Sequence, residues 1–246
     1  MMMKVSLAAF TAAVLTTSVV DGFTVAPRIN SATTGGAFGT KSTTALPMAT
    51  AGSLGCRPIG IGAASPETVV SNVDLEKVVE TSDDWIKTRT GISNRHVLLH
   101  EESIKDLASK AGQQALDMSG VDPLDIDLVI CATSSSDDLF GDATSIANNL
   151  GCTNAMAFDL TAACSGFLFS TVTAGQFLNN PGDMKNALVV GADALSRWVD
   201  WDDRNSCILF GDGAGAMVLT KDEGAPGVLG YSAHSNGAGY DKLKLK

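Results

Sequence analysis

The residue best suited to chemistry is Cys164, which stands among small side chains in the segment FDLTAACSGFLFS. An apolar run predicts a strand before it, and residues 163–180 have the pattern of a helix. The cysteine is therefore expected in the first turn of that helix. Helix N-termini carry unpaired N–H groups and the positive end of the helix dipole, and both favour a thiolate. The N–H of the cysteine itself could hold a developing oxyanion, so the pattern indicates an acyl-accepting nucleophile.

The same pattern also fits a small cysteine that packs in a core, and spacing alone does not separate the two roles. No sequence context marks a base for Cys164 among His96, His100 and His234. There is no CxxC spacing, which argues against a zinc site or a disulfide framework, so no metal is expected. Two of the five cysteines, Cys131 and Cys207, lie in apolar runs and are expected to be core residues; the others are Cys56, Cys152 and Cys164.

A glycine-rich segment, 210–216, invites comparison with a phosphate-binding loop. It lacks the GxGxxG spacing, and no helix pattern follows it. Two apolar runs flank an Asp-Gly pair within and around this segment. That arrangement predicts a β-hairpin with a tight glycine turn rather than a nucleotide site.

Strand and helix patterns alternate along the body of the chain. Short apolar runs predict buried strands at 126–135, 154–161 and 186–195. Helix patterns cover 72–92, 103–120, 142–150 and 163–180. The second helix is expected to begin with a capping box formed by Ser103 and Asp106 and to end at Gly120. This alternation predicts βαβ units, and hence an α/β fold with a mostly parallel sheet.

The composition fits such a compact body, with 246 residues, 45% of them hydrophobic and 18% charged. The net charge is −10, while residues 1–55 carry +2, so the remainder carries −12. An acidic body is a poor binder of nucleic acid, because contacts to phosphates need Lys and Arg. For the same reason an acidic carrier protein would need a local basic patch in order to dock.

The N-terminal segment is expected to be a targeting sequence. Residues 1–22 have a basic start and an apolar run too short to span a membrane comfortably, which predicts a signal peptide. Residues 23–54 contain no Asp or Glu and are rich in Ser, Thr, Ala and Gly, which predicts a transit peptide. The junction at Phe23 resembles the two-part targeting sequences of algae with complex plastids. The expected location is the plastid stroma, without membrane attachment after processing; the alternative is a secretory leader followed by a linker.

Several segments together resemble the β-ketoacyl-acyl-carrier-protein synthase III family of the thiolase superfamily. They run from about Pro58 to the C-terminus and include TSDDWIKTRTGI, AACSGF, ALVVGADALSR and HSNGAGYDKLKL. The resemblance implies a thiolase-like fold of two related halves in α–β–α–β–α layers, and a homodimer in the full-length form. It assigns residues 55–220 to the N-terminal domain and 221–246 to the start of a C-terminal half that is largely missing.

The resemblance also implies a reaction. Cys164 would take the acetyl group from acetyl-CoA and condense it with malonyl-acyl-carrier protein, giving CO2 and the 3-oxoacyl-carrier of type II fatty acid synthesis. A CoA thioester and acyl carrier protein are thus the expected substrates, with no bound cofactor. Thr81, Trp85 and Arg204 match positions that contact CoA. Phe140 matches the residue that reaches across the dimer to the partner's acyl pocket, although its context FGDAT departs from the family's usual spelling.

The family's catalytic His and Asn, and the glycine-rich loop of its oxyanion hole, are expected beyond Lys246. On this expectation the chain as given would be acylated slowly at most and would not condense. Two alternatives stay open. One is a non-catalytic half-synthase that binds acyl carrier protein or pairs with a full-length relative. The other is a related condensing enzyme of the polyketide type, which the primer found on Cys164 would distinguish.

Overall fold

The computed structural model describes residues 54–180, 182–222, 224 and 227–242. All of them fall in one compact unit, Leu46–Lys246. The predicted signal peptide and nearly all of the predicted transit peptide lie outside the described residues. Leu54, the last residue assigned to the transit peptide, is fully buried against the sheet. The folded body therefore begins no later than Leu54.

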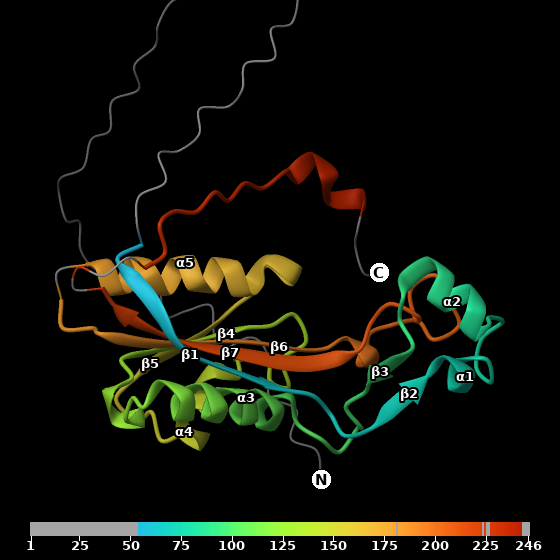
Figure 1. Ribbon diagram of the computed structural model, residues 1–246, viewed down its shortest axis with the longest axis horizontal. Helices are drawn as coiled ribbons and strands as arrows, with labels where there is room; N and C mark the ends of the chain where they lie inside the picture. Colours follow the sequence, from blue (N-terminus) through green and yellow to red (C-terminus); the bar gives the residue numbers. More distant parts are fainter. Residues whose placement is uncertain (1–53, 181, 223, 225–226, 243–246) are drawn as a thin grey trace, which may run out of the picture. The chain divides into compact units, whose positions relative to one another are not determined.

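A five-stranded sheet forms the centre of this unit (Figure 1). Its order is β1-β7-β6-β4-β5, and β4 runs parallel to both β5 and β6. β7 runs antiparallel to β1 and to β6, so the sheet is mixed. The predicted strands at 126–135, 154–161 and 186–195 are confirmed as β4, β5 and β6. The strands are β1 (Cys56–Ala64), β4 (Leu128–Ala132), β5 (Met156–Leu160), β6 (Asn186–Ala194) and β7 (Asp212–Lys221).

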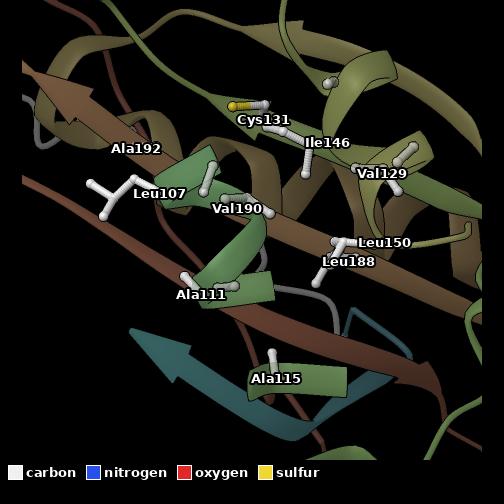
Figure 2. Packing of buried hydrophobic residues seen from close by; sticks show 14 of the residues in the cluster. Leu107, Ala111, Ala115, Val129, Cys131, Ile146, Leu150, Leu188, Val190 and Ala192 are labelled. Carbon is white, nitrogen blue, oxygen red and sulfur yellow. The ribbon is translucent and has the colours of Figure 1, made fainter. Parts of the chain in front are cut away.

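Helices cover both faces of the sheet, as the alternating pattern predicts (Figure 1). α3 (Ile104–Ser119) and α4 (Ala143–Asn149) pack on one face, and α5 (Gly166–Asn179) packs on the other. Figure 2 shows residues of the first layer, where side chains of α3 and α4 meet those of β4 and β6. Successive residues of β4 point to opposite cores, which is why its apolar run is continuous. Among the described helices, none is long and apolar enough to cross a membrane.

The prediction of one continuous helix at 72–92 is wrong. The structure has two short helices there, α1 (Asn72–Leu75) and α2 (Asp83–Thr90). Each begins at its own serine cap, because Ser71 accepts the N–H of Asp74 and Ser82 accepts the N–H of Trp85. They lie beside a two-stranded sheet of β2 (Val69–Ser71) and β3 (Asn94–His96).

The capping of α3 also differs in part from the expectation. Ser103 caps the helix, and Gly120 ends it in the left-handed conformation with φ 69°, as predicted. The Ser103 hydroxyl accepts the N–H of Lys105 and Asp106, and it donates to the carboxylate of Asp137 rather than belonging to a reciprocal box with Asp106. The reciprocal capping box is instead formed by Ser71 and Asp74 at α1.

The hairpin predicted around 210–216 is wrong. The glycines after Asp212 lie inside the long strand β7, and the preceding apolar run forms turns, with Cys207 and Ile208 packing against Leu75 and Ile86. The physical reason is the buried carboxylate of Asp212. It accepts the N–H of Leu98 at 2.6 Å and the N–H and hydroxyl of Ser196 at 2.9 and 2.5 Å. Asp212 therefore fixes the start of a strand where the sequence pattern suggested a turn.

Candidate active site

Cys164 lies in the short connection between β5 and α5. It occupies the middle of a single 3-10 turn, η3 (Ala163–Ser165), and α5 begins two residues after it at Gly166. The predicted helix 163–180 is thus confirmed, except that its first turn is wound more tightly. The cysteine side chain is exposed. The strand–turn–helix placement expected of a nucleophile is therefore present, and the alternative of a cysteine sealed in the core is excluded.

The backbone of this turn is strained at Ala163, the residue before Cys164. Ala163 has φ 46°, which makes it the one non-glycine residue with a positive φ in the described part of the chain. An L-residue in that region costs about 1–2 kcal/mol. Such outliers persist only where the surrounding structure holds them, and they gather at functional sites. The turn is closed by the N–H of Ser165, which donates to the carbonyl of Ala162 at 3.1 Å.

Close packing places the start of α5 against the sheet. A Cβ atom on Gly166 would lie 3.1 Å from the Cβ of Ala132 at the end of β4. A Cβ on Gly191 of β6 would lie 3.0 Å from the ring of Phe167. Both glycines therefore permit a helix–sheet approach that larger residues would prevent. The approach sets Cys164 at the edge where the parallel strands end.

The other four cysteines are buried. Burial raises the pKa of the thiols of Cys56, Cys131 and Cys207, with nearby carboxylates adding to the effect, and it raises the pKa of Cys152 to about 11. These thiols are protonated and shielded at neutral pH, so they are poor nucleophiles. The core roles predicted for Cys131 and Cys207 are confirmed. Cys164 is therefore the accessible thiol among the described residues.

The fold brings Trp85 and Arg204 into contact, although they lie far apart in the sequence. The guanidinium carbon of Arg204 lies 4.1 Å from the centroid of the Trp85 ring, and that of Arg89 lies 4.2 Å from it. Arg204 also donates to the carbonyl of Glu80 at 3.1 Å. The half-buried indole packs on the small core around Ile86 and keeps part of its surface exposed. Cation–π contacts of this kind suit a flat aromatic ligand such as a nucleobase.

Arg89 was missed by sequence reasoning, although the signal was present. Residues four apart on a helix lie on one face, and Arg89 follows Trp85 by four positions on α2. Thr81 lies next to Glu80, whose carbonyl holds Arg204. The Thr81 hydroxyl oxygen is buried and has no hydrogen-bond partner. A buried hydroxyl without a partner needs an explanation, and a polar ligand group at this site would supply one.

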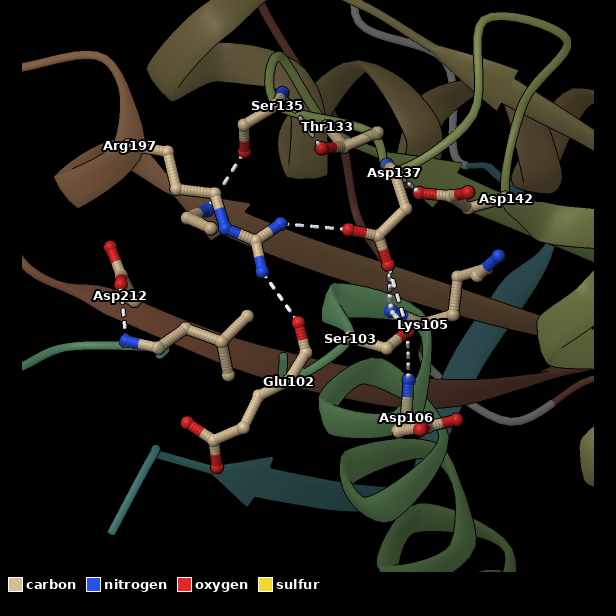
Figure 3. A network of polar contacts seen from close by, with 12 residues as sticks. Glu102, Ser103, Lys105, Asp106, Thr133, Ser135, Asp137, Asp142, Arg197 and Asp212 are labelled. Carbon is tan, nitrogen blue, oxygen red and sulfur yellow. Dashed lines mark hydrogen bonds and ion pairs between the residues drawn. The ribbon is translucent and has the colours of Figure 1, made fainter. Parts of the chain in front are cut away.

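Phe140 lies apart from these residues, at the tip of the loop between β4 and α4. Its side chain is 96% exposed and that of Leu139 is 94% exposed. The base of the loop is tied down, as Figure 3 shows: the carboxylate of Asp137 accepts from Arg197 at 2.8 Å and from Ser103 at 2.7 Å. The loop borders a cavity of about 410 Å³. No hydrogen bond or ring contact within the described part of the chain joins Phe140 or Trp85 to Cys164.

The pKa values of two carboxyl groups at the base of this loop, those of Asp142 and Asp137, are shifted in opposite directions. Burial, together with the carboxylates of Asp137 and Asp159, raises the pKa of Asp142, and one of its oxygens is buried without a partner. The Asp137 side chain is partly covered, and this desolvation opposes ionisation, but hydrogen bonds from Ser103, Arg197 and Lys105 lower its pKa on balance. The ionised form of Asp142 therefore costs stability, whereas the ionised form of Asp137 contributes it.

We expect Asp142→Asn to raise the free energy of unfolding at pH 7.5 by roughly 1 kcal/mol, because it removes a buried charge with an unpaired oxygen. A raised folded-state pKa gives stability that is full below the unfolded pKa and is lost as pH rises through the folded pKa. The gain should therefore vanish below about pH 4. Urea unfolding at pH 4 and 7.5 measures it. Asp137→Asn is the control with the opposite sign: it should destabilise at pH 7.5, and its effect should fade as pH falls.

Solved structures with the same fold include a 3-oxoacyl-[acyl-carrier-protein] synthase III and a priming β-ketosynthase. The crystal structure of 3-oxoacyl-[acyl-carrier-protein] synthase III from Aquifex aeolicus is 45% identical, with a TM-score of 0.65, over 69% of this chain and 55% of that one. The priming β-ketosynthase of the R1128 polyketide pathway is 34% identical, with a TM-score of 0.66, over 72% of this chain and 53% of that one. The sheet, its helix layers and the cysteine turn thus define a thiolase-like α/β protein.

Sequence comparisons narrow this class to one family. Residues 158–237, which include Cys164, match the family of 3-oxoacyl-[acyl-carrier-protein] synthase III. β-Ketoacyl-[acyl-carrier-protein] synthase III of Synechococcus sp. strain WH7803 is 56% identical over 185 residues, covering 75% of this chain and 54% of the relative. The corresponding protein of strain RCC307 is 55% identical over 195 residues, covering 78% and 57%. The chain belongs to the β-ketoacyl-acyl-carrier-protein synthase III family, and it spans about half the length of these relatives.

Proposed function

We propose that the protein to which this chain belongs is a condensing enzyme of type II fatty acid synthesis. In this reaction the sulfur of Cys164 attacks acetyl-CoA, releases CoA and carries the acetyl group as a thioester. The acetyl group then joins the carbon exposed by decarboxylation of malonyl-acyl-carrier protein, with loss of CO2 and return of the thiol. The observation that carries the proposal is Cys164 itself: an exposed thiol, beside a strained backbone, between β5 and α5.

Thr81, Trp85 and Arg204 are proposed to bind the CoA thioester. The nucleobase would lie on the indole in contact with the guanidinium, and the unpartnered Thr81 hydroxyl would meet a polar group of the same ligand. Arg204 and Arg89 already lie 4.1 and 4.2 Å from the ring centroid, so the ligand must displace one of these guanidinium groups to stack on the indole. No bound cofactor is part of the proposal, and among the described residues no group of His, Cys, Asp and Glu could hold a metal ion.

Loss of this stacking surface should weaken CoA binding more than it weakens the chemistry. We expect Trp85→Ala or Arg204→Leu to raise the KM for acetyl-CoA about tenfold, with a smaller change in kcat, because a base-stacking contact is worth about 1–3 kcal/mol. Steady-state kinetics of the full-length protein measure this. Trp198→Ala is the matched control, since Trp198 is an exposed tryptophan outside this cation–π group. Equal changes in all three variants would contradict the assignment.

Phe140 is proposed to enter the acyl pocket of a partner subunit in a full-length homodimer. Its nearly complete exposure on a loop with a fixed base fits a side chain that is buried by another chain. Acyl carrier protein is the second proposed partner. Because the body of the chain is acidic, that carrier would have to dock on a local group of basic residues.

The experiment that tests the reaction uses labelled acetyl-CoA. The full-length protein is incubated with it and digested, and the acetylated peptide is identified by mass spectrometry. Acetyl on the Cys164 peptide supports the proposal, and acetyl on another residue, or none, contradicts it. In a second step malonyl-acyl-carrier protein is added to the full-length protein, and formation of the 3-oxoacyl-carrier is measured.

The second candidate is a condensing enzyme of the polyketide type, favoured by the similarity to the R1128 priming ketosynthase. A set of acyl-CoA primers separates it from the first. Preferential labelling of Cys164 by acetyl supports fatty acid synthesis, whereas preference for longer or aromatic primers supports the second candidate. A non-catalytic half-synthase would carry no acyl group on Cys164 and would instead co-purify with acyl carrier protein or a full-length relative.

The plastid stroma is the proposed location of the protein. The basic and apolar residues 1–22 and the acid-free residues 23–54 support a two-part targeting sequence. Residues 1–54 fused to a fluorescent protein, expressed in an alga with a complex plastid, test this. Fluorescence within the plastid supports the proposal, and secretion of the fusion contradicts it.

A further inference from the structure

A polar network closes the turn that follows β4, at the same edge of the sheet as the nucleophile. One carboxylate oxygen of Asp193, on β6, accepts the N–H of Ser134 at 2.8 Å, the hydroxyl of Ser135 at 2.9 Å and the hydroxyl of Thr133 at 3.4 Å. Thr133 and Ser135 are buried. A single oxygen thus accepts hydrogen bonds from each of the three residues that follow β4.

The network is closed by bonds between its own members. The hydroxyl of Ser135 accepts the N–H of Ala194, the residue after Asp193, at 2.8 Å. The hydroxyl of Thr133 accepts the N–H of Ser135 at 3.1 Å. Each hydroxyl therefore both donates and accepts, which fixes its orientation. The end of β4 is consequently held to β6 by side chains as well as by the strand ladder.

The same residues hold the segment that leads to Cys164. The N–H of Thr133 donates to the carbonyl of Leu160 at 3.2 Å, and the hydroxyl of Thr161 donates to the carbonyl of Thr133 at 2.7 Å. Thr161 precedes Cys164 by three residues and opens the turn that contains the strained Ala163. A continuous path of hydrogen bonds thus runs from Asp193 through Thr133 to the base of the nucleophile turn.

We propose that Asp193 is a positioning residue for Cys164, acting through Thr133 and Thr161. The proposal rests on the proposed function in one respect, that Cys164 is the reacting thiol. A strained turn keeps its conformation only while its surroundings over-determine it. Removal of the Asp193 carboxylate leaves the N–H of Ser134 and the buried hydroxyl of Ser135 without their acceptor, so the end of β4 must rearrange. Thr161 moves with it, and the sulfur loses its place beside the start of α5.

A matched control exists at the opposite end of β4. The carboxylate of Asp127 accepts the N–H of Lys185 at 2.7 Å and of Asn186 at 3.0 Å, where β6 begins. Like Asp193, it uses one oxygen to hold the backbone of a neighbouring segment of the same sheet. It lies at the other edge of the parallel strands, away from the nucleophile turn. Removal of the Asp127 carboxylate therefore measures how much stability is lost when such a side-chain acceptor is removed away from Cys164.

The test measures the rate at which iodoacetamide alkylates Cys164 in the 246-residue chain, followed on its own peptide by mass spectrometry. We expect Asp193→Ala to slow alkylation roughly threefold, the size of a lost helix N-terminal interaction. Asp193→Asn should react at nearly the wild-type rate, because its amide oxygen can still accept the same bonds. Asp127→Ala should also react at the wild-type rate, although its melting temperature falls by a similar amount.

A second pair of variants covers the case in which Asp193→Ala does not fold. Thr161→Val removes the hydroxyl that reaches Thr133 and should slow alkylation to a similar extent, while Thr161→Ser should restore it. The proposal is overturned if folded Asp193→Ala or Thr161→Val reacts at the wild-type rate, or if Asp127→Ala is slowed equally. No acyl-CoA takes part in this test. Failure of acetyl transfer to the full-length protein would therefore defeat the proposed function, whereas the alkylation rates decide the role of Asp193.

Discussion

Cys164→Ala is expected to abolish transfer of the acetyl group from acetyl-CoA to the chain. The reaction needs an accessible sulfur, and the other four cysteines are buried with raised thiol pKa values. No second thiol can therefore take over. Removal of a covalent nucleophile costs at least about 1,000-fold in related chemistries. Labelled acetyl-CoA, followed by isolation of the protein and counting of the bound label, measures the loss.

Two companion variants make this result specific. Cys152→Ala removes a buried thiol and should retain wild-type labelling. Cys164→Ser keeps the shape of the side chain but replaces the thiol with a hydroxyl that is far less ionised at neutral pH, so it should carry little label. Full labelling of Cys164→Ala would mean that another residue accepts the acetyl group. Lost labelling of Cys152→Ala at unchanged stability would mean that accessibility does not select the nucleophile.

Gly62→Ala is expected to lower the free energy of unfolding by about 3 kcal/mol, the upper part of the usual range for overpacking. α3 lies directly on β1, and a Cβ atom on Gly62 would overlap the backbone carbonyl oxygen of Ala111. The obstacle is helix backbone rather than a flexible side chain, so the helix itself would have to move. Gly60 stands in the same relation to the carbonyl of Ala115. Urea unfolding followed by circular dichroism gives the change.

Gly215→Ala is the matched control for this prediction. Gly215 lies on β7, the strand beside β1, and the nearest atom to its Cβ would be the carbonyl oxygen of Gly62 at 3.9 Å. That is ordinary contact, so the change should stay within about 1 kcal/mol, the usual span for glycine against alanine in a strand. Similar losses in both variants would mean that β1 does not depend on the close approach of α3.

The elements predicted correctly are those whose signals are local. The strands β4, β5 and β6 and the helix α5 were predicted from the spacing of apolar residues within short stretches of sequence. The errors arose where a distant partner decides the conformation. Asp212 starts a strand because Leu98 and Ser196 donate to it, and nothing near Asp212 in the sequence announces those donors.

The helix predicted at 72–92 failed for a related reason. Its apolar periodicity continues through the break, but Ser71 and Ser82 each cap a separate helix, and the small core around Leu75 and Ile86 is completed by Cys207 and Ile208. Periodicity alone carries no information about where two short helices pack on a loop from the other end of the domain. The pairing of Trp85 with Arg204 depends on the same long-range arrangement.

That Cys164 follows a strand and precedes a helix could be read from the sequence, because strand and helix periods and small neighbouring residues are local properties. The motifs along the body of the chain also indicated the family. Three features became visible only in the folded chain: Cys164 is exposed while the other cysteines are buried, Ala163 is held at positive φ, and Asp193 ties the end of β4 to β6. Exposure, strain and contacts between distant residues arise when the layers pack, and no short stretch of sequence contains them.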